Sequence, residues 1–347
     1  MQQVSDALKA ASELGASNEE LQREQWLALA QSRQMRLAEP QLPRLLRDRE
    51  YDNKEVCRAF VIGFIRNNRT DVALQLLEPW ITDATDDATP LLLRARIYRL
   101  LSAPNKAEQD LRDAIQREPD WTEPELELAE LLIERKRFSE AASLLESMDG
   151  QNPHVARTNI GLAECRLAEG QAESAVSLLR SACDADAESL DAHVALGRTL
   201  LEVGEYTESV DVLKLALQLR PGYDETHYLL AQAYSLSDRR ELAEEHLEFV
   251  ESARSALQEL DKINADLMQD AGDPSRLTRA GEIQLLYGDP NEGIIRILAA
   301  LDLDPGNANA LQLLADYYQS KASLSDKYRN LASQYQQRLT EAKKLSE

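Results

Sequence analysis

Small and apolar residues recur along this chain every 34 residues. One column is made of leucines: Leu77, Leu111, Leu145, Leu179, Leu213 and Leu247. Two more are made mostly of alanines: Ala73, Ala107, Ala141, Ala175, Ser209 and Ala243, and then Ala95, Ala129, Ala163, Gly197 and Ala231. The same step separates Gly170 from Gly204 and spaces Pro119, Pro153, Ala187 and Pro221. Columns that share one register predict a tandem repeat in which each unit packs on its neighbours.

Each column suits one place in a pair of antiparallel helices. A small residue in the first helix lets the second helix approach closely, and the leucine one turn after the recurrent alanine fills the remaining space. Glycine or a short polar residue permits the turn between the helices, and proline ends the second helix. Aromatic residues make up only 5% of a chain rich in Leu and Ala, which favours helices over strands. We therefore predict an all-α chain.

The clearest unit is DAHVALGRTLLEVGEYTESVDVLKLALQLRP, residues 191–221. It resembles the tetratricopeptide repeat, of the tandem type found in bacterial proteins, through Gly197, Gly204, Tyr206, Leu213, Ala216 and Pro221. The resemblance extends over residues 54–341. It implies a right-handed superhelical solenoid of antiparallel helix pairs, in which the first helices line a concave groove.

The register divides the chain into segments. Six 34-residue units are expected over residues 54–257, starting at 54, 88, 122, 156, 190 and 224. An insertion at 258–273 is followed by two further units, from 274 and 308, and a C-terminal capping helix within 274–347. Residues 1–53 are expected to hold an N-terminal cap helix and a degenerate repeat. That helix is either a true cap or the remaining half of a pair from a longer chain.

The insertion is expected to lengthen a helix. Apolar residues from Leu242 onward follow alternating steps of four and three, which gives a narrow seam: Leu242, His246, Phe249, Ala253, Ala256, Leu260, Ile263 and Leu267. Either the last two units pack back along this seam, or residues 242–267 mediate self-association.

The formal net charge of −22 excludes broad classes of partner. A surface this acidic repels nucleic acids and anionic lipids. No stretch approaches the roughly 20 apolar residues of a membrane span, so we expect no direct membrane insertion. The chain is expected to be cytoplasmic if complete, and periplasmic or membrane-anchored if it is a trimmed fragment.

No pattern in the sequence points to catalysis. There is no glycine-rich phosphate or dinucleotide loop and no HExxH motif. The cysteines Cys57, Cys165 and Cys183 lie far apart and resemble no metal-ligand spacing. His193 and His227 occupy a column that the resembled family fills with packing residues. We therefore predict no enzyme activity, no cofactor and no metal site.

The register also assigns the residues that face the groove. They are expected to be Arg58, Ile62, Ile65, Arg66, Leu92, Arg96, Arg99, Glu123, Leu126, Glu127, Glu130, Ile133, Glu134, Arg157, Glu164, Asp191 and Arg198. Glu123, Glu127, Glu130 and Glu134 share one helix face, and we call them the glutamate stripe. Like charges at this spacing repel by roughly 0.2–0.5 kcal/mol per pair. Either arginines of neighbouring first helices pair with the stripe, or a segment carrying Lys or Arg binds across it.

These features favour a non-catalytic scaffold or adaptor that holds a protein or peptide segment, with basic character, in the groove. The alternatives are a regulatory or targeting module of a larger enzyme or membrane-anchored protein, and a homo-oligomeric structural subunit. Some tetratricopeptide co-chaperones hold a carboxylate with Lys and Asn side chains of their first helices. We expect no such clamp here, because we find no Asn in the groove column.

Overall fold

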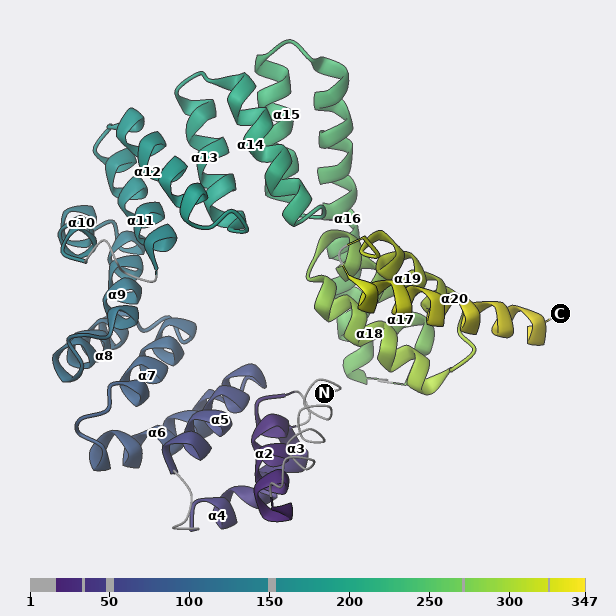
Figure 1. Ribbon diagram of the computed structural model, residues 1–347, viewed down its shortest axis with the longest axis horizontal. Coiled ribbons are helices and arrows are strands. Elements are labelled where there is room, and N and C mark those ends of the chain that lie inside the picture. The colour runs from purple at the N-terminus through teal and green to yellow at the C-terminus, as the bar shows by residue number, and fades with distance from the viewer. Residues whose placement is uncertain are drawn as a thin grey trace. The chain divides into compact units, whose positions relative to one another are not determined.

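The computed structural model describes residues 17–32, 35–47, 53–148, 154–269, 272–323 and 325–346, and within these ranges every regular element is a helix (Figure 1). The predicted all-α class is therefore confirmed. The chain divides into two compact units, Met1–Glu169 and Gly170–Glu347, which we call the N-terminal and C-terminal units. The expected cap helix near residues 4–15 and Pro153 lie outside the described residues.

In the N-terminal unit, antiparallel helix pairs follow one longer helix and three short ones (Figure 1). The longer helix is α2 (Asn18–Ala30), and the short ones are α3 (Met35–Ala38), the 3-10 helix η1 (Glu39–Gln41) and α4 (Leu42–Leu45). The pairs and the final first helix are α5 (Asn53–Arg66), α6 (Thr70–Asp83), α7 (Thr89–Leu100), α8 (Pro104–Arg117), α9 (Thr122–Glu134), α10 (Phe138–Glu146) and α11 (Val155–Ala168).

The C-terminal unit continues the pattern with one much longer second helix. Its elements are α12 (Ala172–Ala185), α13 (Leu190–Glu202), α14 (Tyr206–Leu219), α15 (Asp224–Leu236), α16 (Arg240–Gln269), α17 (Pro274–Tyr287), α18 (Pro290–Leu303), α19 (Ala308–Ser320) and α20 (Asp326–Ser346). First helices begin at residues 53, 89, 122, 155, 190, 224, 274 and 308, each within one residue of a predicted unit start. The assignment of both chain ends as caps stays a prediction.

One residue between the two helices of a pair adopts a left-handed backbone, and these residues lie 34 positions apart. They are Asn68 (φ 56°), Ser102 (φ 53°), Lys136 (φ 58°), Gly170 (φ 77°), Gly204 (φ 86°) and Asp238 (φ 58°). Glycine and short polar residues reach this region at low cost, as the sequence pattern predicted. Lys136 departs from that prediction, since its side chain is neither short nor able to bond its own backbone. The repeat therefore imposes the turn geometry even where the residue does not favour it.

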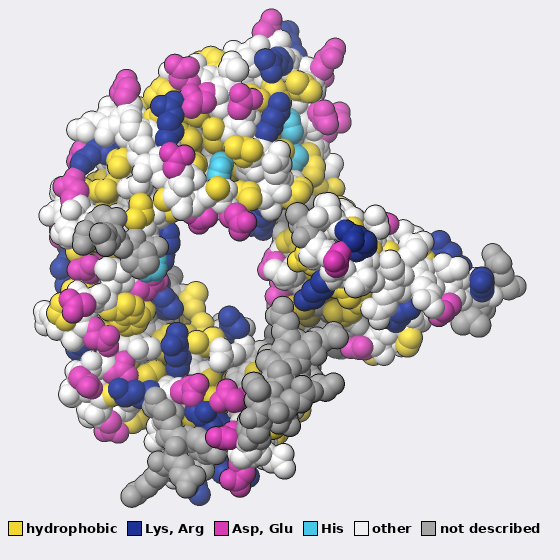
Figure 2. Space-filling view, viewed as in Figure 1, with side chains coloured by type: hydrophobic (Ala, Val, Ile, Leu, Met, Phe, Trp, Pro, Cys, Tyr) yellow, Lys and Arg dark blue, Asp and Glu magenta, His cyan; other side chains and the backbone are white. Residues whose placement is uncertain are grey.

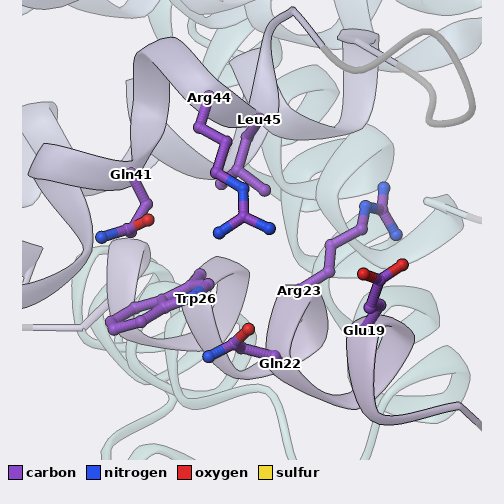
Figure 3. Close-up of a pocket in the computed structure, with 7 residues that line it drawn as sticks. All are labelled: Glu19, Gln22, Arg23, Trp26, Gln41, Arg44 and Leu45. Carbon is purple, nitrogen blue, oxygen red and sulfur yellow. The ribbon is translucent and has the colours of Figure 1, made fainter.

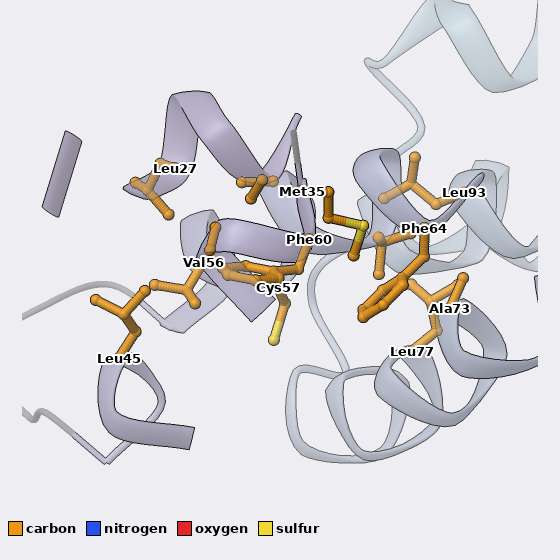
Figure 4. Packing of buried hydrophobic residues seen from close by; sticks show 14 of the residues in the cluster. Leu27, Met35, Leu45, Val56, Cys57, Phe60, Phe64, Ala73, Leu77 and Leu93 are labelled. Carbon is orange, nitrogen blue, oxygen red and sulfur yellow. The ribbon is translucent and has the colours of Figure 1, made fainter. Parts of the chain in front are cut away.

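Hydrophobic side chains of α2 to α7 pack into one cluster in the N-terminal unit (Figure 4). A Cβ atom added at Gly63 of α5 would lie 1.9 Å from the carbonyl oxygen of Ala30 at the end of α2. Phe60 and Phe64, on the same helix, are fully buried in the cluster that also holds Leu77 of α6. The absence of a side chain at Gly63 is therefore what lets α2 rest directly on α5.

The leucine column forms the core, with one exception. Its first five members are at most 1% exposed, whereas Leu247 is 45% exposed. The expectation that Leu247 fills a gap in the core is therefore wrong. Helix α16 instead turns Ala243 and His246 inward, and the His246 ring lies against the rings of His227 and Tyr234. The repeat register continues in the sequence, but aromatic rings occupy the space that leucine fills elsewhere.

The extended helix α16 carries the predicted seam, and the next helix pair covers its centre. Ala256 and Leu260 form one cluster with Ala280 and Ile283 of α17. The structure shows the first of the two alternatives for the seam, in which the helices after the insertion pack back against α16. Leu242, at the start of the seam, remains 40% exposed.

Candidate functional site

The predicted groove residues do not all reach the surface. Leu92 and Leu126 are 3% and 1% exposed, so the prediction that they contact a partner is wrong, and they belong to the core. Ile62, Ile65 and Ile133 are partly buried and pack on the hydrophobic clusters beneath them. Both leucines instead pack against second helices, Leu92 in a cluster with Leu111 of α8 and Leu126 in a cluster with Leu145 of α10.

The remaining predicted positions differ in their surroundings. Arg58 is exposed on α5, and Arg66 donates a hydrogen bond to the Gln31 carbonyl oxygen at 2.8 Å. Glu164 is exposed on α11. Arg198 lies in the C-terminal unit, where it pairs with Glu225 of α15. Asp191 is exposed on α13.

The glutamate stripe of α9 is paired with arginines of the two neighbouring first helices. Arg96 of α7 lies 2.5 Å from Glu127 and 3.2 Å from Glu123. Arg99 lies 2.5 Å from Glu134 and 3.7 Å from Glu130. Arg157 of α11 lies 2.7 Å from Glu130 and 3.1 Å from Glu123.

This pairing is the first of the two alternatives that the sequence left open. Three arginines face four glutamates, so the cluster keeps an excess of one acidic group. His154 also lies 3.2 Å from Glu123. Figure 2 shows acidic and basic side chains interspersed over the visible face, in keeping with this arrangement. The stripe is therefore a network of ion pairs and not a bare acidic surface.

Glu127 is a structural part of this network. It is 4% exposed, and its Oε1 accepts a hydrogen bond from Arg96 Nε at 2.6 Å. Burial raises the pKa of its carboxyl group, and the hydrogen bond from Arg96 opposes that rise. No group in the described residues donates a hydrogen bond to its Oε2, which lies 4.0 Å from Arg99 Nη1. The prediction that Glu127 meets a partner at the surface is therefore wrong.

A hollow beside the stripe contains an apolar residue that sequence reasoning missed. Arg96, Arg99, Leu100 and Glu134 line a volume of about 420 Å³. Leu100 is 64% exposed, and Leu101 beside it is 50% exposed. Leu100 is the last residue of α7, one position past Arg99. An apolar residue at the end of an otherwise charged helix face was the signal that could have revealed it.

A second hollow lies between α2 and α4 (Figure 3). The Arg44 guanidinium points into it above the Trp26 ring, and Arg23 lies at its side with Glu19. Arg23 is engaged by Glu24 and Glu55. The space measures only about 60 Å³, which is enough for a small chemical group and too little for a large peptide side chain.

A third hollow, of about 340 Å³, separates α17 from α19 and is lined by Asn309, Gln312, Ser275 and Glu282 among others. Asn309 is the second residue of its unit, the position that Glu123 holds in an earlier one. The statement that the groove column contains no Asn is therefore wrong for the last unit.

The described part of the chain shows no group of three or more His, Cys, Asp or Glu side chains placed to hold a metal ion. Nor does any described helix have the length and apolar character needed to cross a membrane. Cys57 and Cys165 are buried and Cys183 is partly buried. Burial raises the pKa of both Cys165 and Cys183 to about 11, so both are neutral thiols at neutral pH.

This architecture is similar to that of known repeat proteins. A family model described as tetratricopeptide repeat matches three overlapping stretches, residues 98–157, 132–182 and 166–216. The structure of PilW, a widely conserved type IV pilus biogenesis factor, is similar with a TM-score of 0.52 and 19% identity, over 56% of this chain and 91% of PilW. PilF of Pseudomonas aeruginosa is similar with a TM-score of 0.51 and 16% identity, over 66% of this chain and 96% of PilF.

At these identities the likeness to PilW and PilF concerns the fold alone. No curated protein sequence matches the chain. The family matches run from the end of α7 to α14, through the helix pairs that carry the glutamate stripe. Residues 98–216 of this chain are therefore recognised as tandem tetratricopeptide repeats.

Proposed function

We propose that this protein is a non-catalytic scaffold or adaptor, and that it binds a partner segment on the face formed by α7 and α9. The observation that carries the proposal is the hollow of about 420 Å³ in which exposed Leu100 stands between two arginines and Glu134. Tandem repeats expose a long surface for their mass, and such surfaces commonly bind extended segments. An exposed apolar side chain ringed by charged groups is the usual composition of a small binding site.

The partner segment places an apolar side chain on Leu100 and a basic group beside Glu134. The Glu134 side chain is 55% exposed and pairs with Arg99 through Oε1. Glu130, at 36%, is the next most accessible member of the stripe. Because glutamates outnumber arginines by one in this cluster, a Lys or Arg of the partner meets a net attraction there. The glutamates closer to the core, Glu127 and Glu123, already form ion pairs with Arg96 and Arg157.

The test compares two doubly substituted proteins in affinity capture from native cell lysate. One carries Leu100→Asn and Glu134→Lys in the hollow. The other carries Leu37→Asn and Asp83→Lys, an exposed leucine and an exposed aspartate on α3 and α6. We expect the first variant to lose the partner and the second to retain it, with both showing wild-type helicity by circular dichroism. Equal capture by the two variants would refute binding at the hollow.

A homo-oligomeric role is the second candidate, and exposed leucines on α16 favour it. Leu242 and Leu247 are 40% and 45% exposed on the part of the helix that precedes its contact with α17. Light scattering of the full chain over a hundredfold range of concentration tests this role. A mass of one chain throughout would remove it without bearing on the hollow at Leu100.

A further inference from the structure

Two imidazole rings meet between α15 and α16 in the C-terminal unit. Nδ1 of His227 lies 2.9 Å from Nδ1 of His246, which is hydrogen-bond distance. Both rings are enclosed by aromatic neighbours. Phe249 stacks on His227 with ring centres 3.6 Å apart, and Tyr234 stacks on His246 at 5.6 Å. The contact is therefore built into the packing of the two helices.

The surroundings of His227 settle which atom carries the proton in the neutral pair. Its Nε2 lies 2.9 Å from the carbonyl oxygen of Pro221, which can only accept a hydrogen bond. Nε2 must therefore be protonated, and in a neutral ring Nδ1 then has only a lone pair. The hydrogen between the rings consequently belongs to Nδ1 of His246. Only one arrangement of tautomers satisfies all three atoms.

This arrangement accepts one proton without breaking. Nε2 of His246 makes no hydrogen bond within the described residues, so it can take up a proton while Nδ1 keeps donating to His227. A hydrogen bond from a charged imidazolium to a neutral nitrogen is stronger than the neutral one. The stacked Tyr234 ring also favours a cation at His246.

A second proton cannot be accepted in the same way. The only free site on His227 is Nδ1, the atom that receives the hydrogen bond. Once it is protonated, two N–H groups point at each other across 2.9 Å and both rings are positively charged. The two rings must then move apart.

The groups around the two histidines both raise and lower their pKa values. Burial lowers the pKa of His227, while the hydrogen bond to Pro221 and the charges of Asp224 and Glu245 raise it. Burial, His227 and Lys214 of α14 lower the pKa of His246, and Glu245 raises it. From α17, the ring of Tyr287 packs on Phe249. The pKa of each imidazole is therefore lowered, so both are neutral at pH 7 and take up a proton at a lower pH than an ordinary histidine.

We infer that His227 and His246 form a proton-sensitive joint, which holds α16 against α15 while at most one ring is charged and opens when both are. The joint lies at the start of the 30-residue helix whose later part packs on α17. Opening would loosen the helix that joins the pairs before and after it. The inference is independent of partner binding at Leu100.

The test follows the full chain from pH 7.5 to pH 4.5 by two methods. Imidazole resonances of histidine-labelled protein report each protonation step, and hydrogen exchange reports the protection of amides in α15 and α16. His246→Gln is the key variant, because its amide can donate to His227 Nδ1 without titrating. His193→Gln is the control, since Nδ1 of His193 lies 2.8 Å from the Ser189 carbonyl oxygen of its own helix and contacts no second imidazole.

In the wild type we expect His227 and His246 to titrate in two steps separated by at least about a tenfold change in proton concentration. Amide protection in α15 and α16 should fall at the second step, whereas His246→Gln should keep it and His193→Gln should behave as the wild type. The inference is overturned if the wild-type helices keep full protection after both rings are charged. It is equally overturned if the two rings titrate as independent groups, a readout that does not require the variant to fold.

Discussion

Charge reversal at Glu127 should unfold the helix pairs around α9 and should not act as a simple change of surface charge. Glu127 is 4% exposed and bonded to Arg96. Removing one partner of a fully buried ion pair costs about 3–5 kcal/mol, and we expect the lower end of that range here because the Arg96 side chain is 43% exposed and still pairs with Glu123. In Glu127→Lys, the new ammonium also lies close to Arg99, whose Nη1 is 4.0 Å from the present Oε2.

Two unit charges at that distance repel by about 4 kcal/mol at an effective dielectric constant of about 20. The sum of the two effects is comparable with the entire stability of a typical domain, about 5–15 kcal/mol. Glu134→Lys is the matched control on the same helix face. Its side chain is 55% exposed, and exposed ion pairs of this kind contribute at most about 1 kcal/mol.

Urea unfolding followed by far-ultraviolet circular dichroism measures the free energy of unfolding of both variants. Hydrogen exchange in α7 and α9 shows whether the loss is local, as expected when each repeat contacts only its neighbours. If Glu127→Lys lowers the free energy of unfolding no more than Glu134→Lys does, the carboxylate of Glu127 is not buried against Arg96. If Glu127→Lys does unfold these helix pairs, failure of that variant to capture a partner would show unfolding and not the loss of a binding residue.

Two further predictions concern packing and thiol chemistry. Gly197→Ala places a Cβ 2.5 Å from Cγ of Leu213, so it should destabilise the protein by about 1–3 kcal/mol in urea unfolding, whereas Gly306→Ala, whose nearest atom is 3.6 Å away, should change stability by less than about 0.5 kcal/mol. Similar losses at both glycines would contradict the packing. Cys165 and Cys183, each with a pKa of about 11, should react with iodoacetamide at pH 8 at least about a hundredfold more slowly in the native protein than in urea. Equal rates in mass-spectrometric labelling would show that the thiols are not buried.

The fold could be predicted from the sequence because residues of the same size recur at equivalent positions in many units. A glycine such as Gly197 and a leucine such as Leu213 meet within one helix pair, and their column fixes the pair wherever it recurs. Prediction failed at Leu247, where the column persists but the packing differs. A repeat shows which positions are equivalent in sequence. An insertion such as the one that lengthens α16 can change which residues pack against each of those positions.

The glutamate stripe shows why the charges on a first-helix face were harder to predict than its helices. Spacing within α9 revealed only mutual repulsion, because the partners lie on other helices. Arg96 meets Glu127 and Glu123 at sequence separations of 31 and 27 residues, and Arg157 meets Glu123 at 34. These separations are the repeat length, or the repeat length less about one or two helical turns.

The same spacing recurs in the C-terminal unit, where Arg198 meets Glu225 at a separation of 27 residues. Adjacent first helices therefore face each other with a constant offset, and charges on them pair at separations that the repeat itself defines. A charge on a first helix has to be weighed against residues about 27, 31 and 34 positions away before it is counted as free. By that measure the stripe is paired, and its exposed outer member Glu134, beside Leu100, becomes the point at which a partner's charge can add to the network.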